Sequence, residues 1–140
     1  MTAAPDSRDY GPLGILIQAL ADAEILRKIA PGSFWPPPKI HSALVRVRPS
    51  LEKMRRVPDV LRLQSMLAGL FAHRRQTLSN AFKHSLHDAY TEALKARLAG
   101  RFDLSRRPET FAISDFLELA QMLRAPNDGP PASSPETPDV

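Results

Sequence analysis

Apolar residues follow two different spacings within the first fifty residues. Residues 11–21 are mostly apolar, which is typical of a buried helix. Residues 22–29 favour a strand, with an extension of the helix as the open alternative. Residues 42–48 alternate between two sets of side chains, which predicts a strand with one wetter face. The first set is Ala43, Val45 and Val47, and the wetter set is Ser42, Leu44, Arg46 and Arg48.

From residue 59 onward, apolar side chains recur every three or four positions, which predicts short amphipathic helices around one small core. Asp59 and Ser114 stand where the N-caps of the first and last helices are expected, and Gly100 is expected to end the third helix. The expected helical stretches are Val60 to Phe71, Arg74 to Leu86, Asp88 to Leu98 and the residues from Ser114 to Leu123.

Three segments interrupt these patterns. Residues 31–39 contain four prolines and a glycine, which exclude regular structure and predict an ordered loop. Residues 50–58 are basic and contain a proline, so they are interpreted as a linker and a domain boundary. Residues 126–140 contain five prolines and few apolar residues, so a disordered tail is expected there.

The composition excludes several classes of protein. The 140-residue chain has no cysteine, which excludes disulfides, thiolate zinc sites and cysteine nucleophiles and fits a reducing compartment, so a cytoplasmic location is expected. The longest apolar stretch, 15–26, is interrupted by polar residues and falls short of the roughly 20 residues of a membrane span, so no membrane partner is expected. His84 and His87 have a spacing that can place two metal ligands on one face, but no third ligand accompanies them, and no metal is expected.

Charge is unevenly distributed. The net charge is +4, but residues 39–107 hold 15 Lys and Arg against 5 Asp and Glu, a local balance of +10 between acidic ends. Clustered cations of this kind favour a surface that faces a polyanion such as nucleic acid, because binding releases counterions from the phosphates. The alternative is an ordinary solvated charged surface.

Three groups of residues go beyond these patterns. The first is Tyr10-Gly11-Pro12-Leu13 followed by Phe34-Trp35-Pro36-Pro37-Pro38-Lys39-Ile40-His41-Ser42, the second is Phe71-Ala72-His73-Arg74-Arg75-Gln76-Thr77-Leu78-Ser79-Asn80, and the third is Arg107-Pro108-Glu109 with Ser114-Asp115-Phe116. Together they resemble the rRNA adenine dimethylase family, which includes the small-subunit rRNA dimethyladenosine transferases. The chain departs from the family pattern at Gly14, Ile40, His41 and Gln76.

The resemblance implies an α+β fragment. Residues 1–50 would be the last helix and antiparallel strands of a Rossmann-like methyltransferase domain, and residues 51–125 a small all-α C-terminal domain that binds rRNA. The family's methyl donor is S-adenosylmethionine, whose site needs a glycine-rich turn and an Asn-x-Pro-Tyr type loop. The chain contains neither, so we expect it to bind no cofactor and to be inactive in isolation. A gene model that begins at an internal methionine is the preferred explanation, ahead of a split gene or a free-standing module.

The resemblance also implies roles for individual residues. Phe34, pinned by prolines, would stack on the target adenine, a contact worth about 1–3 kcal/mol per base. Lys39, Arg74 and Arg75 would hold the RNA backbone. The alternative for Phe34 is that it covers the edge of the sheet, and the role of Trp35 is left open.

Arg74 and Arg75 are expected on a helix, where neighbouring side chains point about 100° apart. One would then meet phosphate, and the other would pair with an acid such as Glu118. Asn80 is expected to cap the helix or bond locally.

The expected partner is small-subunit rRNA or a ribosomal particle, and a monomer is expected. Two other interpretations remain open: a stand-alone RNA-binding module or non-functional fragment, and a large-subunit rRNA dimethylase of the resistance type. The helix that carries Arg74, Arg75 and Asn80 favours the small-subunit branch.

Overall fold

The first described helix runs directly into a two-stranded ribbon. The structure is a computed structural model that describes residues 3–7, 9–57 and 59–123. Helix α1 (Pro12–Leu20) begins with a proline, whose fixed φ suits the first turn. Strand β1 (Ala21–Ile29) follows at once and pairs antiparallel with β2 (Ser42–Pro49), with an irregularity between Ile25 and Arg27. The predicted helix and both strands are therefore confirmed, and residues 22–29 form a strand rather than more helix.

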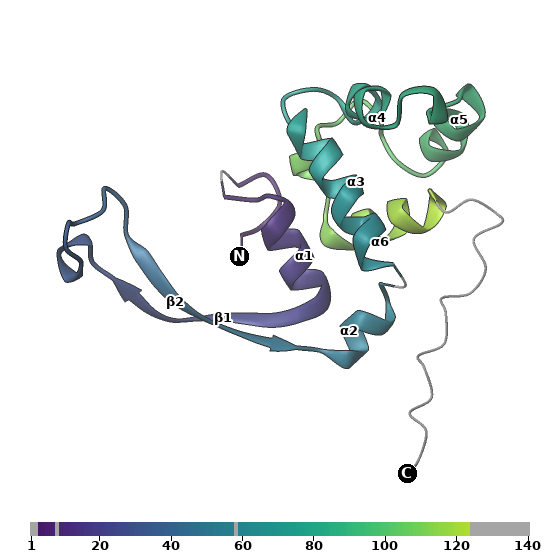
Figure 1. Cartoon of the computed structure of the whole chain (residues 1–140). Coiled ribbons are helices and arrows are strands. Elements are labelled where there is room, and N and C mark those ends of the chain that lie inside the picture. Colours follow the sequence, from purple (N-terminus) through teal and green to yellow (C-terminus); the bar gives the residue numbers. More distant parts are fainter. Residues whose placement is uncertain (1–2, 8, 58, 124–140) are drawn as a thin grey trace, which may run out of the picture.

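The ribbon extends away from the helices as a long curved arm (Figure 1). Its side chains are largely accessible on both faces, and Leu44 and Val47, which were expected on opposite faces, are 53% and 45% exposed. The prediction of one wetter face is therefore wrong, because Ala43 and Val47 are exposed as Leu44, Arg46 and Arg48 are. A strand buries one face only where a second layer covers it, and the described helices contact the ribbon only near its base.

The segment between the ribbon and the helices is not an extended linker. Residues Leu51–Arg55 form the short helix α2, whose N-terminus is capped when the Ser50 hydroxyl accepts a hydrogen bond from the Lys53 amide. The basic stretch predicted as a linker over 50–58 thus contains one short helix, because a capping serine precedes residues with good helix propensity. The division of the chain at this point into two domains stays a prediction.

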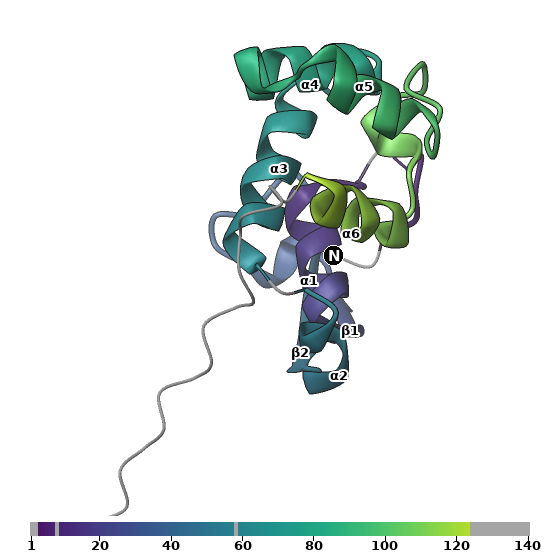
Figure 2. The same cartoon turned by 90° about the vertical axis from the view of Figure 1, so that its right-hand side faces the viewer.

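Four further α-helices form the body of the molecule (Figure 2). They are α3 (Val60–Ala72), α4 (Leu78–Leu86), α5 (Glu92–Ala99) and α6 (Ile113–Met122), with short 3-10 turns η2 (His87–Ala89) and η3 (Pro108–Thr110) between them. Asp59 caps α3 by accepting a hydrogen bond from the Arg62 amide at 2.9 Å, as predicted. Gly100 is the C-cap residue of α5, also as predicted.

Three predicted helix starts are wrong, each because another residue satisfies the first free amides. Helix α4 begins at Leu78 rather than Arg74, since Thr77 accepts from the Asn80 amide. Helix α5 begins after Thr91, which caps it in the same way, and not at Asp88. Helix α6 begins before Ser114: its N-cap is Ala112, whose amide donates to the carboxylate of Asp115 at 2.9 Å.

One hydrophobic core joins α1 to the helical body. Tyr10 and Ile15 are buried in the same cluster as residues of α3, α4 and α6. Phe71 lies at its centre, with its ring 6.3 Å from that of Tyr10 and 5.9 Å from that of Phe116. Met66 and Leu119 are also buried.

Two sequence predictions concern the ends of the chain and the membrane. The tail predicted over 126–140 lies outside the described residues. Among the residues that are described, no helix combines the length and apolar character that a membrane crossing requires.

Candidate nucleic-acid interface

The loop at the far end of the ribbon presents aromatic side chains. It begins with the 3-10 turn η1 (Pro31–Ser33), where the Phe34 amide donates to the Pro31 carbonyl at 3.2 Å. Phe34 is 42% exposed and Trp35 is 96% exposed, and prolines occupy the three positions that follow. Proline rings restrict the backbone, so little entropy is lost when such a loop binds a ligand. The loop can therefore present an aromatic face at the outermost part of the molecule.

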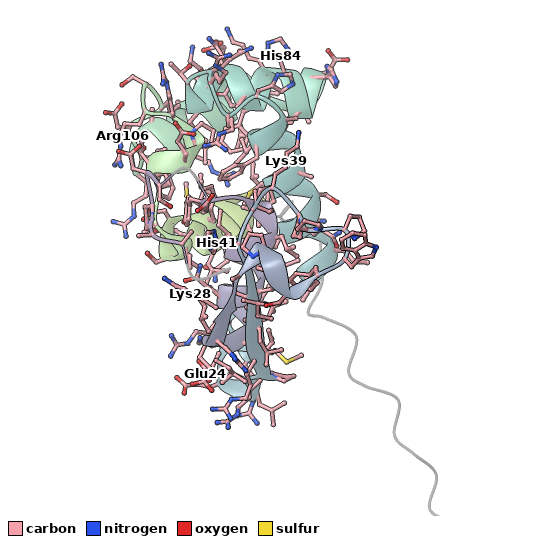
Figure 3. All side chains as sticks on the ribbon, turned by 90° about the vertical axis from the view of Figure 1, so that its left-hand side faces the viewer. Glu24, Lys28, Lys39, His41, His84 and Arg106 are labelled. Atoms are coloured by element: carbon pink, nitrogen blue, oxygen red, sulfur yellow. The ribbon has the colours of Figure 1, made fainter. Side chains whose placement is uncertain are left out.

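The outer ribbon carries only positive charge. Residues 25–45, which run from β1 through the loop to the paired part of β2, contain Arg27, Lys28 and Lys39 and no Asp or Glu. Lys28, Lys39 and His41 lie on the side of the molecule from which the ribbon projects (Figure 3). Within the described part of the chain, Lys39 has no acidic partner. The ribbon end therefore combines aromatic faces with free positive charge, the two features that attract unstacked nucleotides.

Nearer the body, the cations of the ribbon are engaged. Arg46 pairs with Glu24 directly across the two strands. Lys53 lies 2.7 Å from the Asp22 carboxylate and donates a hydrogen bond to the Ala21 carbonyl at 2.8 Å. The first pair joins the two strands and the second joins β1 to α2, so acidic partners for the cations lie at the base of the ribbon and not at its tip.

Arg74 and Arg75 lie in the turn between α3 and α4, not on a helix. Arg74 donates from Nε to the Glu109 carboxylate at 2.8 Å, its Nη2 lies 2.8 Å from the same oxygen, and the Glu109 side chain is only 18% exposed. Arg75 is exposed and has no acidic partner among the described residues. The predicted helix position of both arginines is therefore wrong, and the acid that pairs with Arg74 is Glu109 instead of Glu118. A phosphate contact by one of them stays a prediction.

Glu109 and its neighbours connect the three groups of residues that were singled out from the sequence. The Glu109 carbonyl accepts a hydrogen bond from the Asp6 amide at 2.7 Å, while its carboxylate holds Arg74. Two residues further on, the Phe111 carbonyl accepts from the buried Tyr10 hydroxyl at 2.8 Å. Burial, and secondarily the nearby Asp115 carboxylate, raises the pKa of Tyr10 to about 12.

Sequence reasoning missed the role of Glu109. Its place in the Arg107-Pro108-Glu109 group was noted, but no local spacing links it to Arg74, which lies 35 positions earlier. The available signal was indirect: both residues belong to groups that resemble the same family.

Several other cations of the helical body have partners. Arg101 pairs with Glu118 at 2.5 Å, and this hydrogen bond raises the pKa of Arg101. Arg106 lies over the Phe111 ring, 4.7 Å from its centre, and bonds to Thr110. Hydrogen bonds from Ser105 lower the pKa of Asp103. These groups order the loop before α6, which positions Glu109.

The histidines and Asn80 play no visible part in a ligand cluster. The rings of His73 and His84 stack with their centres 4.5 Å apart, so His84 is paired with His73 and not with His87. Among the described residues, no three His, Cys, Asp or Glu side chains gather closely enough to hold a metal ion. Asn80 is exposed in the first turn of α4, where its backbone amide donates to the capping Thr77.

The described residues do not fit a methyl-donor site of the nucleotide-binding type. Such sites form at the carboxyl ends of parallel strands, where a glycine-rich turn enters a helix. The sheet described here has two antiparallel strands, and β1 follows α1 without a turn. The described residues therefore supply no recognisable site for a methyl donor of this type.

Comparisons with known proteins give the same family as the sequence motifs. Residues 1–123 match the family model described as ribosomal RNA adenine dimethylase. Curated relatives named ribosomal RNA small subunit methyltransferase A are similar to this chain: the protein of Alcanivorax borkumensis is 31% identical over 98% of the chain and 47% of its own length, and that of Wolbachia pipientis wMel is 38% identical over 86% and 40%.

Solved methyltransferase structures share the fold. A dimethyladenosine transferase from Plasmodium falciparum matches with a TM-score of 0.69 at 20% identity, covering 84% of this chain and 50% of that one. The 23S rRNA methyltransferase ErmE matches with a TM-score of 0.50 at 22% identity, covering 85% and 49%.

These matches identify first a class and then a family. By fold, the chain is similar to RNA methyltransferases. By sequence, it belongs to the ribosomal RNA adenine dimethylase family. The chain spans about half the length of the curated relatives that it matches.

Proposed function

We propose that this chain is the RNA-facing, C-terminal part of an S-adenosylmethionine-dependent enzyme that dimethylates adenines of small-subunit rRNA during ribosome biogenesis. The observation that carries the proposal is the outer end of the ribbon, where an exposed Phe34 stands in a proline-restricted loop on a segment without acidic residues. Family membership and the names of the curated relatives supply the substrate class.

The parts of the chain would then have distinct tasks. Residues 1–50 would complete the catalytic domain, and residues 51–125 would form the helical domain that contacts rRNA. Phe34 would stack on the flipped adenine, while Lys39 and Arg75 would contact phosphates. Arg74, held by Glu109, would position the turn that carries Arg75. The donor would be bound by residues outside this chain.

The small-subunit substrate is favoured over a large-subunit one. The curated relatives of highest similarity reported above carry the small-subunit name, and the dimethyladenosine transferase gives the higher TM-score of the two structures. The resistance-type enzymes remain the second candidate because ErmE shares the fold.

RNA binding by the purified chain tests the proposal. We expect the chain to bind a hairpin RNA with an unpaired adenine in its loop, followed by fluorescence anisotropy, with an affinity that falls steeply as salt rises. Lys39→Ala is expected to reduce the slope of log affinity against log salt by about 0.7, the value for one single-strand phosphate contact. Binding that does not change with salt would contradict the proposal.

Phe34→Ala tests the stacking role. It is expected to weaken binding of the adenine hairpin by about 5- to 150-fold and to leave the salt slope unchanged, because a base contact releases no counterion. Leu13→Ala is the matched control, since Leu13 is 61% exposed on α1, away from the ribbon tip. If Phe34→Ala and Leu13→Ala lowered the affinity for the hairpin equally, Phe34 would have no stacking role.

A donor titration tests the division of tasks. Isothermal titration of the chain with S-adenosylmethionine is expected to give no binding at concentrations that saturate the complete relatives. Tight binding would place the donor site in this chain and overturn the proposed arrangement.

A further inference from the structure

Trp35 is the side chain that the proposed function leaves unexplained. It is the only tryptophan of the chain, and it is 96% exposed. Tryptophan is a large apolar residue that is usually well buried, so an indole left almost wholly in water points to a binding role. No contact of Trp35 with another part of the described chain accounts for its position.

The backbone separates Trp35 from Phe34. Phe34 has φ −123° and ψ 153°, which is extended backbone. In an extended chain, successive side chains point to opposite sides. The extended backbone at Phe34 directs the two side chains to different sides of the chain, so the loop offers two aromatic surfaces.

The charge of the segment around Trp35 indicates which kind of partner the indole binds. The segment 25–45 contains Arg27, Lys28 and Lys39 and no acidic residue, and Lys39 lies four residues after Trp35. A second copy that placed its own ribbon end against this loop would bring the same positive charge to the contact and would be repelled. A strand of RNA supplies both a phosphate for the cations and a flat base for the indole.

We propose that Trp35 is a second stacking platform, which binds an unpaired RNA nucleotide other than the one that faces Phe34. This inference rests on the proposed function and extends it: the loop would hold two nucleotides on opposite sides, and the second would fix the position of the first. The proline run after Trp35 keeps the indole in place with little loss of entropy on binding.

The tryptophan fluorescence of the chain tests the second stacking platform directly, because Trp35 is the only source of indole emission. The probe is the adenine-loop hairpin RNA, together with a matched hairpin whose loop nucleotides next to the adenine lack their bases. We expect the first RNA to quench the indole emission as it binds, with a midpoint equal to that of the anisotropy titration. The abasic hairpin is expected to bind with much less quenching.

Three variants separate stacking from a structural effect. Trp35→Ala is expected to weaken binding of the intact hairpin about 5- to 150-fold, with the salt slope unchanged and with little effect on the abasic hairpin. Trp35→Phe keeps an aromatic ring and is expected to restore most of the affinity. Leu61→Ala, which removes a side chain that is 74% exposed on α3, is the control and is expected to bind like the original chain.

The outcomes distinguish this inference from the proposed function. Salt-dependent RNA binding without quenching, and with Trp35→Ala equal to the original chain, would overturn the second platform and leave the proposed function standing. Absence of RNA binding would overturn both. Emission that shifts to the blue as the protein concentration rises, without RNA, would show that the indole contacts a second copy and would also overturn the inference.

Discussion

The ribbon and the helical body use apolar residues in opposite ways. In the body, the faces of α3, α4 and α6 meet in one core, and residues such as Leu67 and Phe82 are fully buried. In the ribbon, apolar side chains remain accessible along both strands, and Ile25 and Leu44 are about half exposed. The same chain therefore holds a self-contained unit and an arm that its own residues leave uncovered.

This difference shows what each region depends on. The helices bury their apolar faces against one another and against α1 in one shared cluster. An isolated two-stranded ribbon is marginal in water, and it becomes independently stable only with further strands or a packed layer. We infer that the ribbon is the region that gains from a partner, and that its tip is the part that remains available to a ligand.

A pair of leucine variants tests the contrast with the largest expected effect. Leu67→Ala in α3 should lower the free energy of unfolding by about 2–5 kcal/mol, because it leaves a cavity in the core. Leu44→Ala in β2 should lower it by less than about 1 kcal/mol, since that side chain is already in water. Urea unfolding followed by circular dichroism measures both. Equal losses would mean that the ribbon is packed as firmly as the body.

Tyr10 offers a test of how α1 is joined to the body, with an intermediate effect. Its pKa is raised from 10.0 to about 12 by burial, so the folded state keeps a proton that the unfolded state loses. The stability that this group contributes is complete below pH 10 and falls as the pH rises toward about 12, by about 2–3 kcal/mol in all.

Unfolding measured between pH 9 and pH 12, values on either side of the roughly 10 of an ordinary tyrosine, should show this loss in the original chain. Tyr10→Phe should not show it, although it costs about 1 kcal/mol at neutral pH through the lost bond to the Phe111 carbonyl. Tyr90→Phe serves as the control and should retain the loss at high pH. A Tyr10→Phe chain with unchanged pH dependence would mean that other groups cause it.

Two adjacent arginines give the smallest and most discriminating test. Arg74→Ala should lower the free energy of unfolding by about 1 kcal/mol, because it breaks the half-buried pair with Glu109. Arg75→Ala should change it by less than about 0.5 kcal/mol, since the side chain is exposed, and should instead reduce the salt slope of RNA binding. Glu109→Gln should reproduce the effect of Arg74→Ala. If both arginine variants changed RNA binding alone, the structural role of Arg74 would be wrong.

Local pattern predicted most of the secondary structure. The helix over 11–21, the two strands and the helix from Val60 follow from spacing alone, because side-chain periodicity reflects the geometry of a single element. Errors occurred at helix ends and in 50–58, where single caps such as Thr77 and Ser50 decide where a helix begins.

The sequence by itself determined the family, the aromatic loop between prolines and the excess of positive charge over residues 39–107. Each of the three follows from residue identity and from position along the chain. Only the tertiary structure decided which of the two arginines is engaged, that Tyr10 and Arg74 meet the segment 109–111, and that Trp35 stands in water. These contacts join residues 35 and 101 positions apart. No periodicity encodes such a meeting, because it depends on how whole helices pack around a shared core.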